Sequence, residues 1–140
     1  MANYCCTLRT NYFHVKNEKE FSDLMDSVYG ECEIDVWEDR DADNVPVFAF
    51  GSYGMIAGVM SDPDDSPNDF EYDEFIEGLQ RCVADDDAII MLESGNEKLR
   101  YVAGIASVIT SKDYVVIDLN DEAKKIARKL LKNPDWHGGT

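Results

Sequence analysis

The sequence predicts an α+β fold in two layers, with a mostly antiparallel sheet of about six or seven strands and three helices. Strand-like segments follow one another without helices between them, which is typical of antiparallel pairing. Three other segments carry apolar residues at helical spacing. The chain has 140 residues, of which 44% are hydrophobic and 11% aromatic. It is therefore the usual size of one domain and can bury a core without disulfides.

The first half of the chain is expected to contain one helix and four strands. Asn17 begins the helix, because Glu20 follows three residues later as in a capping box, and the apolar stripe that follows ends at Gly30. Residues 32–37 alternate apolar with mainly acidic residues, so they form a half-buried strand whose outer face carries acids and Trp37. The expected strands are residues 4–15, 32–37, 45–50 and 55–60.

The second half is expected to begin with a loop and a second helix. Residues 61–69, rich in Asp, Ser and Pro, form the clearest loop of the chain, and the helix follows over about 71–84. The wholly apolar run 88–92 predicts a buried central strand, and a turn is expected over 93–97. The last two strands are residues 99–110 and 114–119.

A final helix, from Asn120 or Asp121 to Lys132, has an apolar side and a basic side. The apolar residues are expected to point inward, and they are Ala123, Ile126, Ala127, Leu130 and Leu131. The outward bases are Lys124, Lys125, Arg128, Lys129 and Lys132. They suit the negative end of the helix dipole, and pairing with an acidic patch on a second copy would give a homodimer. Residues 1–133 are expected to form the single domain, followed by a flexible tail, 134–140.

Cysteine usage and the first residues predict a cytoplasmic protein. The four cysteines include no C-x-x-C pair and the chain has only two histidines, so we expect buried free thiols and neither a metal site nor a cofactor. Met1 to Tyr4 do not begin a signal peptide, and no run of about 18 apolar residues predicts a membrane span. We therefore expect no membrane partner.

Negative charge is concentrated in the middle of the chain. The net charge is −16, and residues 31–87 alone hold eighteen acids and two bases. Such a field attracts basic surfaces and disfavours direct contact with nucleic acid. Simple solubility would explain the acids without a partner. The alternative is that they form a surface for a basic partner protein, such as a nuclease or another nucleic-acid-binding protein.

Aromatic residues interspersed among these acids strengthen the second interpretation. Carboxylates spaced along a surface can take the place of phosphates, while an aromatic ring adds a desolvated anchor. The competing interpretation of each aromatic residue is core packing. The expected partner-binding residues are Asp35, Trp37, Glu38, Asp39, Asp41, Asp43, Asp62, Asp64, Asp65, Asp69, Glu71, Tyr72, Asp73 and Glu74.

The sequence contains no catalytic motif and only two weaker candidates for chemistry. Cys5 or Cys6 with His14 could form a nucleophile and base, but nothing in the sequence places them together. Residues 62–73 partly match a calcium loop, yet Pro67 replaces the glycine that such a loop needs. A solvated loop is the expected structure there, and we expect no enzyme activity.

Two blocks of sequence resemble small acidic proteins of bacterial mobile elements, carried by phages and plasmids. The blocks are residues 3–5, 9–13 and 15 at the start, and residues 93–95 and 97–102 later. In charge and size the chain is similar to anti-CRISPR and anti-restriction proteins, some of which imitate DNA. The resemblance implies an inhibitor that blocks a nucleic-acid-handling defence protein, and it carries over no functional residue.

Two other functions stay open at this point. An immunity protein that neutralises a toxin would have the same acidic character. A small-ligand-binding protein or enzyme would instead have a deep polar pocket. Reversing the charges of Asp62, Asp64, Asp65 and Asp69 is expected to weaken binding if the acids dock a basic partner.

Overall fold

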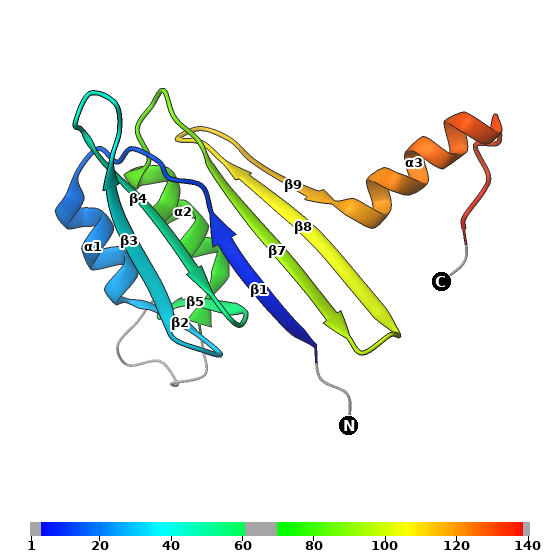
Figure 1. Ribbon diagram of the computed structural model, residues 1–140, viewed down its shortest axis with the longest axis horizontal. Coiled ribbons are helices and arrows are strands. Elements are labelled where there is room, and N and C mark those ends of the chain that lie inside the picture. The colour runs from blue at the N-terminus through cyan, green and yellow to red at the C-terminus, as the bar shows by residue number, and fades with distance from the viewer. Residues whose placement is uncertain (1–3, 61–69, 139–140) are drawn as a thin grey trace.

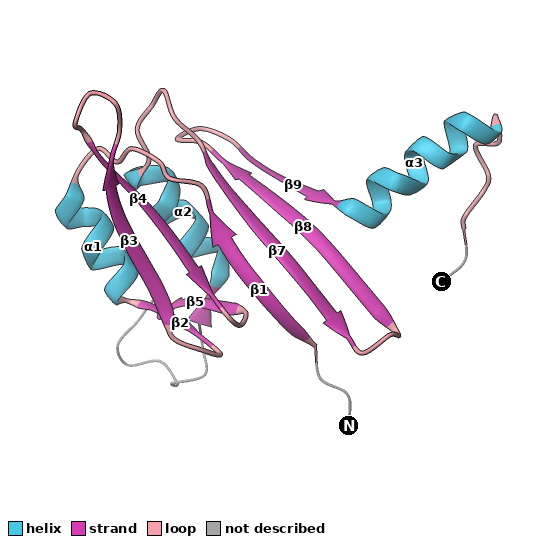
Figure 2. Cartoon of the chain, in the orientation of Figure 1, coloured by secondary structure: helices cyan, strands magenta, loops and turns pink. Residues whose placement is uncertain are grey.

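A computed structural model of the chain describes residues 4–60 and 70–138. It contains the predicted α+β architecture (Figure 1, Figure 2). The strands are β1 (Cys5–Thr10), β2 (Val28–Gly30), β3 (Ile34–Arg40), β4 (Pro46–Ser52), β5 (Ile56–Met60), β6 (Phe70–Glu71), β7 (Ile89–Glu97), β8 (Tyr101–Ile109) and β9 (Tyr114–Asp118). The helices are α1 (Glu18–Asp26), α2 (Tyr72–Cys82) and α3 (Leu119–Leu131).

The main sheet has six antiparallel strands in the order β3-β4-β1-β7-β8-β9. Tight turns join β3 to β4, β7 to β8 and β8 to β9, so most neighbours in the sheet are also neighbours in the chain. Asn44 and Lys98 take positive φ angles of 64° and 51° in the first two turns. A second, three-stranded sheet has the order β2-β5-β6. The prediction of a mostly antiparallel sheet with three helices is confirmed.

The core lies between one face of the main sheet and helices α1 and α2 (Figure 2). Phenylalanine rings connect the layers. Phe13 meets Phe21 of α1 edge-on at 5.5 Å between ring centroids, and Phe50 of β4 meets Phe13 at 6.3 Å and Phe75 of α2 at 6.0 Å. Phe13, Phe50 and Phe75 have no exposed area. In the described part of the chain no helix layer covers the opposite face of the sheet, and we call it the open face.

Helix α1 begins as predicted but ends earlier. The side chain of Asn17 accepts a hydrogen bond from the Glu20 N–H at 3.1 Å, which is the expected cap. The predicted helix to Gly30 is wrong, because Ser27 closes the helix through hydrogen bonds to the Leu24 carbonyl. Residues 28–30 then pair with β5 as a strand. Local helical spacing could not show that this pairing would replace the last turn.

Strand boundaries differ from the predictions where tertiary pairing decides them. β1 stops at Thr10, and only Phe13 and Val15 make isolated bridges beyond it. The predicted turn over residues 93–97 is wrong, because β7 continues through them in register with both β1 and β8. The run 88–92 is not wholly buried, because alternate side chains of β7 point to the open face.

Helix α3 departs most from the expectation. Its N-cap is Asp118, whose side chain accepts from the Asn120 N–H at 3.0 Å. None of its residues is buried, so the prediction that its apolar side faces the core is wrong. The helix instead projects from the end of the sheet (Figure 1). Arg128 Nε donates to the Trp136 carbonyl at 2.8 Å, which ties the following segment to the helix.

Candidate functional site

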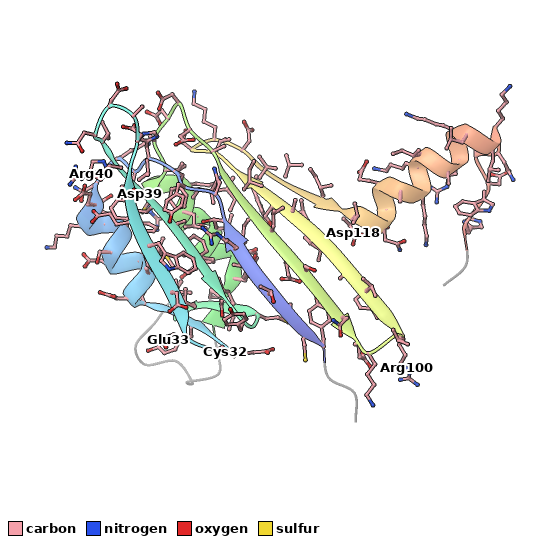
Figure 3. All side chains as sticks on the ribbon, viewed as in Figure 1. Cys32, Glu33, Asp39, Arg40, Arg100 and Asp118 are labelled. Atoms are coloured by element: carbon pink, nitrogen blue, oxygen red, sulfur yellow. The ribbon has the colours of Figure 1, made fainter. Side chains whose placement is uncertain are left out.

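Negative and positive charge lie at different ends of the molecule, as their uneven distribution along the sequence suggested. We call the described residues 4–60 and 70–87 the acidic lobe, which holds eighteen acidic and five basic residues, a net charge of −13. Residues 119–132, which comprise α3 and its C-cap, hold two acidic and five basic residues, a net charge of +3. The two lie at opposite ends of the structure (Figure 3). Figure 3 also places Asp39 and Arg40 at one end of β3 and Glu33 at the other.

Few of the lobe's acids are neutralised by neighbours. Within the described part of the lobe, ion pairs join His14 to Asp41 and Asp87, and Lys16 to Asp85. The acids of α1 and β3 therefore produce a negative electrostatic potential that would attract basic groups of a partner. Self-repulsion of this size lowers folding stability, and binding a cationic surface would relieve it.

Trp37 forms an aromatic platform on the open face of β3. Its ring covers Gly51 of β4, where an added Cβ would lie 3.2 Å from the indole. The Arg9 guanidinium lies 4.8 Å from the centroid of the indole and 5.9 Å from that of Tyr12, so cation–π contacts hold all three groups in place. Trp37 keeps 36% of its surface exposed.

Two predicted acids flank this platform. Asp35 and Asp39 lie two residues before and after Trp37 and share its face, because side chains alternate along a strand. We call Arg9, Tyr12, Asp35, Trp37 and Asp39 the Trp37 surface. It combines an ordered aromatic ring with carboxylates, which is the arrangement that the sequence predicts for part of the binding set.

The structure does not bring the other predicted residues onto this surface. Glu38 lies on the helix side of β3, the face of Val36, which lines a small hollow beside α1. Asp41 and Asp43 lie in the β3–β4 turn. Glu71, Asp73 and Glu74 lie at the beginning of α2. Asp62, Asp64, Asp65 and Asp69 lie outside the described residues.

Tyr72 is half-buried rather than displayed. It packs against the core, with its ring centroid 6.2 Å from that of Phe75, and burial raises its pKa above the ordinary value of a tyrosine. The predicted binding residues that lie in the described part of the chain are thus spread over two faces of the lobe. What these residues share is membership of the acidic lobe rather than of one flat patch.

A cluster that sequence reasoning did not group joins His14 to two aspartates. The His14 Nε2 atom lies 2.6 Å from Asp41 Oδ2, and its Nδ1 atom lies 2.8 Å from Asp87 Oδ2. The backbone N–H of His14 also donates to Asp87 at 2.8 Å. The second oxygen of Asp41 accepts from the N–H groups of Asp43 and Val45. This His14 clamp therefore ties three loops together.

The protonation of the clamp follows from these contacts. Hydrogen bonds to Asp41 and then Asp87 raise the pKa of His14. The hydrogen bond from His14 lowers the pKa of Asp41. Burial opposes ionisation of Asp87, but its hydrogen bonds with His14 and Ala88 outweigh burial and lower its pKa. No local motif could have revealed the clamp, because its members are 27 and 73 residues apart.

The cysteine and histidine residues do not assemble a nucleophile and base. Both ring nitrogens of His14 are occupied by carboxylates, so neither is directed at a thiol. Cys6 is buried, and burial raises the pKa of its thiol to about 11, whereas a nucleophilic cysteine needs a lowered pKa. Cys82 is also buried, while Cys5 and Cys32 are exposed, so the expectation of four buried thiols is wrong for two of them.

A largely apolar groove of about 780 Å³ runs over the open face. Its floor includes Leu92 of β7 and Val102 and Ala106 of β8, and its rim includes Leu119 and Ala123 at the beginning of α3. It differs from the deep polar pocket expected of a small-ligand-binding protein. Its lining suits an apolar ligand or an apolar surface of another polypeptide.

Metal-binding clusters and membrane-spanning helices are absent from the described part of the chain. Residues 4–60 and 70–138 contain no cluster of three or more histidine, cysteine or acidic side chains arranged to hold a metal ion. The candidate calcium loop lies mostly in residues 61–69, outside that part. No helix in these same residues is both long and apolar enough to cross a membrane. A comparison with known protein families, curated proteins and solved structures found no match.

Proposed function

We propose that this protein is an inhibitor that binds a basic, nucleic-acid-handling bacterial defence protein and blocks it, in the manner of an anti-CRISPR protein. The observation that carries the proposal is the net charge of −13 on the described acidic lobe, most of it unpaired. Proteins that bind nucleic-acid phosphates do so through grooves or surfaces with clustered Lys and Arg residues. The positive charge of such a groove attracts a carboxylate-rich surface over long range.

The Trp37 surface supplies the short-range part of the proposed contact. Long-range charge gives fast and oriented association, but affinity depends on a few desolvated anchors. Trp37 is already held between Arg9 and Gly51, so little conformational freedom is lost when a partner covers it. Asp35 and Asp39 then lie beside the anchor, where they meet the partner's bases.

The proposal is tested by measuring inhibition of DNA cleavage by a panel of purified CRISPR and restriction nucleases. For any nuclease that is inhibited, we expect the double variant Asp35→Lys/Asp39→Lys and the variant Trp37→Ala each to weaken binding at least tenfold. We also expect affinity to fall about tenfold between 50 and 500 mM salt, because exposed charges are screened. The matched control is Asp113→Lys/Asp135→Lys, which reverses two exposed acids outside the lobe.

Two results would overturn this assignment. One is binding that neither the lobe reversals nor salt affects, which would remove the role of the acidic surface. The other is the absence of binding to every basic nuclease in the panel. If the partner proves to be a toxin nuclease rather than a defence nuclease, the protein is an immunity protein that uses the same surface chemistry.

A further inference from the structure

Helix α3 carries an apolar stripe that the described residues leave largely uncovered beyond its first residue. Leu119, Ile126, Leu130 and Leu131 recur at helical spacing along one side, and each keeps between 57% and 79% of its surface exposed. Lys125, Lys129 and Lys132 lie on the other side. An amphipathic helix of this kind normally buries its stripe against a sheet or another helix.

The open face of strands β7, β8 and β9 is a second uncovered apolar surface. When one face of an antiparallel sheet meets water, its outward residues are normally polar. Here several of the outward residues are large, apolar and substantially exposed, and they are Ile90, Leu92, Val102, Val115 and Ile117. Helices α1 and α2 lie on the other face, and toward the β3 end of the sheet (Figure 2). They therefore leave this area open.

We propose that the protein forms a symmetric homodimer in which α3 of each copy lies on the open face of β7, β8 and β9 of the other. A second copy fits both uncovered surfaces at once, because each copy offers one helix and receives one. A two-fold axis makes the two contacts identical and closes the assembly. One contact between two copies therefore covers both the helix stripe and the sheet face.

The exposed apolar side chains alone supply more than half of the area that each partner buries in a standard interface. Full burial of a large aliphatic side chain removes on the order of 100 Å² from water. The four stripe residues and five sheet residues, weighted by their exposure, therefore offer roughly 500 Å² in each copy before backbone and polar atoms are counted. A standard interface buries about 800 Å² per partner.

Geometry and charge favour the same arrangement. Leu119 packs over Gly104 of β8, where an added Cβ would lie 3.0 Å from Leu119 Cδ2, so α3 begins on the open-face side of the sheet. The 13 residues of α3 span about 20 Å, or roughly four strand spacings. The net charge of +3 over residues 119–132 meets a copy whose overall net charge is −16, so the docking helix carries the sign opposite to that of its partner.

Light scattering after size-exclusion chromatography, over a range of protein concentrations, tests the dimer without any other partner. We expect the wild-type protein to have twice the mass of one chain. We expect Leu130→Lys on the helix and Leu92→Lys on the sheet each to raise the dissociation constant about 100-fold, because each substitution removes an apolar contact from both copies. The matched control is Leu99→Lys, because Leu99 is fully exposed in the β7–β8 turn and lies outside the proposed contact.

Hydrogen exchange of α3 provides a second readout. In the dimer its amides should be protected, and in the Leu130→Lys variant they should exchange quickly. A wild-type protein that is monomeric at every concentration would overturn the proposal, as would a dimer that neither substitution weakens. A monomer with protected α3 amides would show instead that the helix folds onto its own sheet. None of these outcomes depends on the acidic lobe binding a nuclease.

Discussion

Truncating Phe50 should remove a large share of the protein's stability. Phe50 is fully buried and contacts the rings of both Phe13 and Phe75, so it joins the sheet to α2 and to the segment after β1. A Phe→Ala substitution in a core costs about 3–5 kcal/mol. Because Phe50→Ala removes both ring–ring interactions, we expect it to cost about 4 kcal/mol, out of a total stability of about 5–15 kcal/mol. Phe50→Leu keeps most of the volume and should cost about 1.5 kcal/mol.

The measurement is urea unfolding followed by circular dichroism, together with a thermal melt. For a domain of this size about 4 °C of Tm corresponds to 1 kcal/mol, so Phe50→Ala should melt about 16 °C lower. Tyr53→Ala, beyond the end of β4 and 81% exposed, is the control and should change stability by less than about 0.5 kcal/mol. A loss below about 1.5 kcal/mol for Phe50→Ala would refute the view that this ring joins the two layers.

Three further predictions follow from particular contacts. His14→Asn should destabilise the protein most between about pH 4 and 6.5. Because the pKa of His14 is raised, the clamp stabilises the fold fully below about pH 6.5 and less as pH rises through the pKa of His14 in the folded state. Because the pKa values of Asp41 and Asp87 are lowered, this stabilisation is lost as pH falls below about 4. Thermal melts from pH 3 to 9 check this, with His137→Asn in the C-terminal segment as the control, and a difference in Tm that is constant with pH would contradict it. Gly95→Ala should cost about 1–2 kcal/mol in urea unfolding, because an added Cβ would clash with Tyr4 Oη and displace its hydrogen bond to Glu93. The loss should largely vanish in a Tyr4→Ala background. Asp118→Ala should speed hydrogen exchange in α3 yet leave Tm unchanged at concentrations where the protein is monomeric. Asn17→Ala removes the cap of the packed helix α1 and should lower Tm by about 4 °C.

The fold class was predictable because local signals and the long-range arrangement agree over most of the chain. The Asn17 cap, the apolar stripe of α2 and the short turns between strands all depend on neighbours within a few residues. Short turns make consecutive strands antiparallel neighbours, so the class of sheet follows from connectivity. The strand order did not follow, because β1 lies between β4 and β7, far from both in the chain.

The errors occur where a distant partner decides between two local states. Val28 continues the helical stripe of α1 but pairs with Val59 of β5. Ser94 and Gly95 have turn-like composition, yet β1 and β8 on either side of β7 supply ladder partners for both. Composition indicates the local conformational preference of a segment. A strand that is hydrogen-bonded along both edges gains enough stability from that pairing to override this preference.

The candidate site was predictable only in part, for a related reason. Alternation along β3 placed Asp35 and Trp37 on an exposed face. The role of Arg9 depends on the register between β1 and β4, and the His14 clamp depends on three loops that meet at one end of the sheet. Asp41 was expected to bind a partner, and its carboxylate also holds His14 and the β3–β4 turn, which the sequence did not indicate.

Helix α3 shows how a sequence can specify an element without specifying what covers it. An isolated helix of this length is only marginally stable in water. Yet α3 has a side-chain cap at Asp118, an ion pair between Glu122 and Lys125 at 3.1 Å, and a left-handed C-cap at Lys132. These local contacts support the helix without support from the core. Beyond Leu119, its apolar stripe therefore has no part in holding the described fold together, and such an exposed stripe lowers solubility unless it is buried in an assembly. The same holds for the apolar open face of β7, β8 and β9, and one contact between two copies buries both.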